Sequence, residues 1–174
     1  MSESIDPAWP DIVWVCGGED AACARLAQAI ADGACLGLHR VRWQGAYLDD
    51  EARRLVCRFR APDAESVRLA LHCADGCSHI WPATLFGSDG AAANLVMQRE
   101  FETPPCGDPR RLLALARAEC LEATGGEPGH VLLSRDRRHL LCLCRVPQAA
   151  AARLDGVHHL GGRWRCWRCR YQAA

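Results

Sequence analysis

The stretch LDDEARRLVCRFRAP, residues 48–62, recurs as LSRDRRHLLCLCRVP at residues 133–147, and the two align without a gap. Cys57 corresponds to Cys142, and the offset is 142 − 57 = 85 residues. This spacing is too long for a solenoid repeat and fits a duplicated small domain. We therefore expect two repeats, over residues 11–86 and 94–172, joined by a linker at 87–93 that is rich in glycine and alanine.

In each repeat, the hydrophobic periodicity predicts the order strand, helix, strand, strand, helix, strand. The helices are expected over 20–35 and after the capping residue Asp63, then after the cap Asp108 and over 149–154. The order βαββαβ is that of the ferredoxin-like unit, an α+β fold in which both helices cover one sheet face. Because the strand predicted at 12–16 is apolar on both faces, we expect the two repeats to pack sheet to sheet as a pseudo-dimeric α/β barrel.

Composition limits the classes of partner. The chain has 174 residues, with 21 basic and 21 acidic side chains, so no net field favours nucleic acid or an anionic membrane. No apolar run reaches the roughly 18 residues of a transmembrane helix. The first residues are acidic and lack the pattern of a signal peptide, so we expect a cytoplasmic protein whose twelve cysteines are thiols.

Two segments of the first repeat, WQGAYLDD at 43–50 and LVCRFRAPDAESVR at 55–68, carry a family resemblance. Their strand–turn–strand–helix pattern resembles a family of small bacterial ferredoxin-like proteins that are described as nickel-binding. The chain has Gly45 where that family has histidine. The second repeat keeps His130 and Cys142 but differs at several other positions of the pattern. The resemblance implies the ferredoxin-like fold and a nickel site.

The first candidate metal site is the pair His130 and Cys142. With a hairpin loop at 49–53, Gly45 faces Cys57, and the same register in the second repeat places His130 opposite Cys142. Directly opposed side chains have Cβ atoms about 5 Å apart, which suits two ligands of one Ni, Zn or Cu ion. Cys144, His139 or a residue of the first repeat would be the third ligand. The alternative is a buried histidine beside a core cysteine.

The second candidate is a dense local cluster just before a predicted strand. Four potential metal ligands fall within eight residues: His72, Cys73, Cys77 and His79. Zinc sites usually add a second ligand pair some 12–20 residues away, and no pair has that spacing here. The cluster would bind Zn or Ni alone or with the other repeat. The alternative is a loop with two incidental thiols.

Two further patterns involve cysteine and arginine. Cys166 and Cys169 form a Cys-x-x-Cys motif, but the flanking residues alternate as in a strand, so the two thiols point to opposite faces and redox chemistry is not favoured. Arg42, Arg58 and Arg60 share one face of the predicted sheet. That face either holds a carboxylate or phosphate or is simply solvated.

These observations lead to three functional hypotheses. The first is a cytosolic protein that binds a transition metal, nickel or zinc, or a small anionic molecule between the repeats, as a monomer with two similar halves or as a homodimer. The second, by analogy of fold alone, is a small monooxygenase or isomerase without an organic cofactor, with His130 or His79 as base. The third is a non-catalytic interaction module whose cysteines fill the core.

Overall fold

The computed structural model describes residues 9–17, 30, 36–49, 53–71, 78–87, 93–147 and 160–174. These residues divide into two compact units, one ending at Ala83 and the next running from Thr84 to Tyr171, with Gln172–Ala174 belonging to the first. The division lies a few residues before the predicted linker. Among the described residues, no helix is both long and apolar enough to cross a membrane.

The first unit is built on antiparallel strands in the order β4-β1-β3-β2. Its elements are β1 (Asp11–Gly17), β2 (Arg42–Leu48), β3 (Arg54–Arg60), α2 (Ala64–Ala70) and most of β4 (Ser78–Phe86). Helix α2 begins where expected, because the Asp63 side chain accepts a hydrogen bond from the Ser66 N–H at 2.7 Å. Val67 of α2 packs with Ile12, Leu55 and Phe59 on one sheet face, which is the core of this unit.

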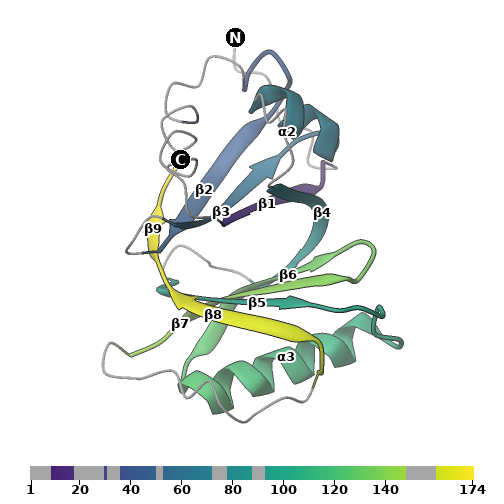
Figure 1. Cartoon of the computed structure of the whole chain (residues 1–174), viewed down its shortest axis with the longest axis vertical. Coiled ribbons are helices and arrows are strands. Elements are labelled where there is room, and N and C mark those ends of the chain that lie inside the picture. The colour runs from purple at the N-terminus through teal and green to yellow at the C-terminus, as the bar shows by residue number, and fades with distance from the viewer. Residues whose placement is uncertain are drawn as a thin grey trace. The chain divides into compact units, whose positions relative to one another are not determined.

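The second unit has antiparallel strands in the order β8-β5-β7-β6 (Figure 1). Its elements are β5 (Leu95–Glu100), α3 (Pro109–Thr124), β6 (Glu127–Ser134), β7 (His139–Arg145) and β8 (Arg163–Arg168). The short β9 (Arg170–Gln172) is divided between the two units, because Gln172 belongs to the first. The sequence predicts α3 correctly: Asp108 caps its start, and Gly125 ends it in the left-handed conformation with φ of 69°. Leu112, Ala116 and Cys120 of α3 pack on one face of the sheet.

The predicted fold class is wrong. Strands make up 48% of the described residues and two helices are described, so the protein is a strand-dominated fold and not a ferredoxin-like α+β fold. Each unit shows one described helix, whereas a ferredoxin-like repeat has two. The helix predicted over 20–35 lies, apart from Ile30, outside the described residues, as does the one over 149–154. The description of the chain as a tandem repeat of ferredoxin-like units is therefore also wrong.

Both predicted hairpins form, but their register is shifted by one residue over most of their length. Ala46, not Gly45, lies opposite Cys57, and Val131, not His130, lies opposite Cys142. The shift arises at the loops, because Leu48 is opposed to Leu55 and Leu133 to Leu140, so each loop is one residue shorter than expected. An irregularity in the ladder between Trp43 and Gly45, and another between Pro128 and His130, restores the expected register beyond it. One extra residue on one strand of a pair turns the following side chains to the other face.

Candidate functional site

The proposed ligands His130 and Cys142 lie on opposite faces of the second unit's sheet. Residues directly opposed in an antiparallel pair share a face, and His130 is opposed to Leu143 while Cys142 is opposed to Val131. Because Val131 and His130 are neighbours in one strand, their side chains point to opposite sides. Cys142 belongs to the core that α3 covers, and the third proposed ligand, Cys144, is bonded to Cys120.

The metal-binding and nickel designations are therefore corrected for the described part of the chain. No group of three His, Cys, Asp or Glu side chains that could hold a metal ion exists among the residues that the structure describes. His139 is half-buried at the start of β7, and His79 is exposed on β4. His72, Cys73 and Cys77 lie outside the described residues, so a Ni or Zn site in that segment stays a prediction.

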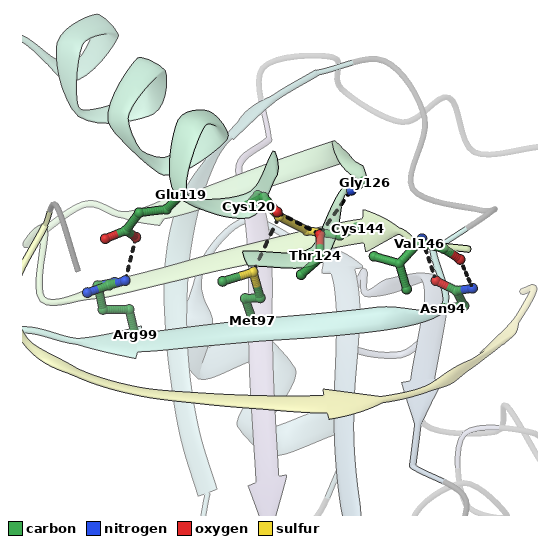
Figure 2. The surroundings of a disulfide bond; sticks show 9 residues. All are labelled: Asn94, Met97, Arg99, Glu119, Cys120, Thr124, Gly126, Cys144 and Val146. Carbon is green, nitrogen blue, oxygen red and sulfur yellow. Dashed lines mark hydrogen bonds and ion pairs between the residues drawn. A yellow bond between two sulfur atoms is a disulfide. The ribbon is translucent and has the colours of Figure 1, made fainter. Parts of the chain in front are cut away.

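A cluster of sulfur atoms fills the core between α3 and the sheet of the second unit. We call it the sulfur cluster, and its members are Met97, Cys120, Cys142, Cys144 and Cys166. The cross-strand register opposes Met97 to Cys142 on one side and to Cys166 on the other, so these three side chains share the face under α3. The Sγ atom of Cys120 lies 3.3 Å from the Sδ atom of Met97. Figure 2 shows Met97 directed toward Cys120 of α3.

The sulfur cluster contains a disulfide, which the sequence analysis missed. Cys120 of α3 and Cys144 of β7 are bonded across 24 residues of sequence and join the helix to the sheet (Figure 2). The expectation that all cysteines are thiols is wrong at these two positions. A weak signal exists in the sequence, since Cys120 continues the apolar stripe of α3 and Cys144 lies in a strand that is apolar on both faces. That pattern places both in the core but does not pair them.

The thiols beside the disulfide are poor nucleophiles. Burial raises the pKa of Cys142 to about 12, although the Arg99 guanidinium acts in the opposite direction. Burial likewise raises the pKa of Cys166 to about 11. A thiol must lose its proton to attack or to bind a metal, so these groups are inert near neutral pH. Cys166 and Cys169 are separate thiols that are not joined by a disulfide.

A buried ion pair lies next to the sulfur cluster. Arg99 on β5 and Glu119 on α3 have side chains 5% and 3% exposed. Arg99 also donates to the carbonyl of Gly161, and the other Glu119 oxygen accepts from the Leu160 N–H at 3.0 Å. The cavity beside the pair measures about 10 Å³, which is at most the room needed for one water molecule. The pair is thus a packed polar element of the core.

The sequence signal for this pair is positional. Arg99 follows Leu95 and Met97 at the two-residue spacing of a strand, and Glu119 follows Leu112 and Ala116 on the buried stripe of α3. Charged residues at inward positions predict burial with a partner. The pattern does not identify the partner, because Arg99 and Glu119 come together only when α3 packs on β5.

The arginine face of the first unit forms as expected. Arg42 on β2 lies directly opposite Arg60 on β3, and Arg58 follows on the same face two residues away. Arg58 Nη2 donates to Asp11 Oδ1 at 3.0 Å, and both side chains are largely buried. Arg42 is exposed and Arg60 half-buried. Neither of these two side chains forms a hydrogen bond or ion pair with another described residue.

We use the name arginine pair for Arg42 and Arg60. Like charges directly opposed in a sheet destabilise it. Asp11 lies opposite Arg60 on the next strand, but its carboxylate is bound by Arg58. Arg58 thus engages the Asp11 carboxylate, and the guanidinium groups of Arg42 and Arg60 form no ion pair with another described residue. The site is electrostatically suited to an anion.

Comparison of the chain with family models, curated proteins and solved structures gives no match. Membership of the family of nickel-binding ferredoxin-like proteins therefore stays a prediction.

Proposed function

We propose that the protein is a non-catalytic binding protein whose first unit holds a small oxyanion, a phosphate or a carboxylate, at the arginine pair. The observation that carries this proposal is the direct opposition of Arg42 and Arg60 across β2 and β3, with the nearby carboxylate of Asp11 bound by Arg58. Planar guanidinium groups bind phosphate and carboxylate oxygens through paired hydrogen bonds. One bound oxyanion would replace the repulsion of the pair by two attractive contacts.

Binding is favoured over catalysis because of the state of the thiols in the second unit. Cys142 and Cys166 are protonated near neutral pH, and Cys120 and Cys144 are bonded to each other. These features support a structural role for the sulfur cluster. The small-enzyme alternative and the cytoplasmic location stay predictions.

Calorimetric titration with inorganic phosphate and with citrate, at constant ionic strength, tests the proposal. We expect saturable binding to the native protein and at least about a tenfold weaker affinity for Arg42→Gln and Arg60→Gln, since charge-assisted hydrogen bonds contribute roughly 1.5–3 kcal/mol. Arg54→Gln is the matched control, because Arg54 is exposed on the same face of β3 at its other end. It should bind like the native protein.

Two results would contradict the proposal. One is heat of binding that does not exceed that of chloride at the same ionic strength. The other is an equal loss of affinity in the control and in the two variants of the pair, since that would indicate a diffuse charge effect.

A further inference from the structure

The last strand of the second unit, β8, presents an open edge with arginine side chains. β8 is the terminal strand in the order β8-β5-β7-β6, and among the described residues of this unit it is hydrogen-bonded to β5 alone. Figure 1 shows it as the outermost strand, with α3 on one face of the sheet. About half of the N–H and C=O groups of an edge strand point outward, where they can pair with another chain.

The exposed side chains of this edge all carry positive charge. They are Arg163, Arg165 and Arg168. Arg163 lies 3.5 Å from the carboxylate of Glu100, and its side chain is 77% exposed. Arg165 is opposed to the neutral Gln98, and Arg168 to Leu95. Glu100 thus pairs with Arg163, whereas Arg165 has no carboxylate directly opposite it among the described residues.

We propose that the β8 edge binds an extended acidic peptide segment of a partner protein by strand addition. An added strand places its residues opposite those of β8, and opposed residues share a face. Arg163 and Arg165 lie on one face, so they favour acidic residues two positions apart in the partner. Trp164 and Cys166 are half-buried on the other face and favour apolar residues between the acidic ones. The expected pattern alternates Glu or Asp with Val, Ile or Leu.

A surface cleft beside the start of β8 offers room for an anchoring side chain. It measures about 370 Å³, and its lining includes Phe101, Pro105, Leu160 and Arg163. Its wall depends on Gly162, because a Cβ atom there would lie 2.6 Å from the carbonyl oxygen of Glu100. A bulky apolar residue at the end of the peptide would contact Phe101 and Pro105 in this cleft. Apolar anchors in pockets supply much of the free energy in such interfaces.

Charge argues against one of the two other occupants that an open edge could accept, and hydrogen-bonding capacity argues against the other. A second copy of β8 would bring arginine against arginine, which is repulsive. A nucleic acid has the required negative charge, but a phosphodiester chain has no N–H groups to pair with the outward carbonyls of the strand. An alternative role for arginine on an edge strand is to prevent aggregation. If that were its only role, the edge would have no affinity for a peptide.

Fluorescence anisotropy with a labelled peptide, Leu-Glu-Val-Glu-Val-Glu-Leu, tests the proposal on the whole chain. We expect saturable binding that weakens with salt, at least about a tenfold loss for Arg165→Glu, and a change below about twofold for Arg117→Glu. Arg117 is the matched control, since it is exposed on α3. Circular dichroism checks that both variants keep the native fold.

Two peptides with N-methyl groups on alternate amides separate strand addition from simple charge attraction. Only one set of amides faces β8, so one methylated peptide should lose binding and the other should keep it. Equal binding of both, no binding of the unmethylated peptide, or tighter binding of a lysine-for-glutamate peptide or of a single-stranded oligonucleotide would each overturn the proposal. These outcomes do not depend on the arginine pair of the first unit, so a failure of either proposal leaves the other standing.

Discussion

Glu119 of α3 and Arg99 of β5 form an ion pair that is almost completely buried in the second unit. The same carboxylate accepts a hydrogen bond from the Leu160 N–H, and the same guanidinium donates to the Gly161 carbonyl. Figure 2 shows the two side chains meeting between the helix and the sheet. The pair therefore fixes three segments that are distant in sequence: β5, α3 and the residues that lead into β8.

Removing one member of this pair should destabilise the protein strongly. Glu119→Leu leaves the Arg99 charge buried without a partner, and Arg99→Met does the same to Glu119, so each should lower the free energy of unfolding by about 3–5 kcal/mol. The double variant removes both charges and should recover most of that loss. Urea unfolding of the four proteins measures the cycle. A double variant as unstable as the sum of the single ones would contradict the role of the pair.

The disulfide between Cys120 and Cys144 should contribute to stability by restricting the unfolded chain. It closes a loop with a sequence separation of 24 residues, for which the chain-entropy model gives about 3.5 kcal/mol. Replacing both cysteines by alanine should lower the free energy of unfolding by about this amount. Cys106→Ala should change it by less than about 0.5 kcal/mol, because Cys106 is exposed.

Mass spectrometry after alkylation under non-reducing, denaturing conditions checks the bond directly. Cys120 and Cys144 should stay unmodified until a reductant is added, whereas Cys106 and Cys142 should react. Alkylation of Cys120 or Cys144 without reductant would show that the bond is absent.

Stability should fall at alkaline pH because of Cys142. Burial raises the pKa of this thiol from 9.0 to about 12 in the folded protein. The unfolded chain loses the proton near pH 9 while the folded protein keeps it, so proton loss favours unfolding above that pH. The stabilising contribution is complete below pH 9 and is lost as the pH rises toward 12.

Urea unfolding at a series of pH values between 8 and about 11 measures this dependence. Cys142→Ala should show a smaller decrease with pH than the native protein. Cys106→Ala is the control, since its thiol is exposed and its removal should leave the native slope. An unchanged slope in Cys142→Ala would show that this thiol is not responsible.

Much of the local structure could be predicted from the sequence. Helix α3 begins at the Asp108 cap and ends at Gly125, as its capping residues indicate, and the alternation of Leu55, Cys57 and Phe59 gives β3 and the face it buries. These features depend on residues that are close in sequence, so local sequence patterns are sufficient to predict them. The fold class depends on how strands associate, and the prediction of a ferredoxin-like fold was wrong.

The proposed His130–Cys142 site does not form because the loop of its hairpin is one residue shorter than expected. A loop of the expected length would oppose the two residues, but Leu133 is opposed to Leu140, so the loop is one residue shorter and the register at His130 is shifted by one. The irregularity between Pro128 and His130 restores the expected register at Pro128. In the first hairpin, the ladder skips Gln44, which precedes Gly45. Glycine in a strand often marks such a bulge, so Gly45 and Gly129 were the available signal. The tertiary pairs Arg99–Glu119 and Cys120–Cys144 had no comparable local signal.

The arginine pair makes a prediction about stability that needs no knowledge of the natural ligand. At low ionic strength and without an oxyanion, Arg60→Gln should raise the free energy of unfolding by about 0.5 kcal/mol, because it removes a like-charge contact with Arg42. Added phosphate should stabilise the native protein more than the variant and so reverse the order of the two melting temperatures. Arg54→Gln, which lies away from the pair on the same strand, should respond to phosphate as the native protein does. A destabilised Arg60→Gln at low salt would mean that this guanidinium has a structural partner, and the anion site would then have to be abandoned.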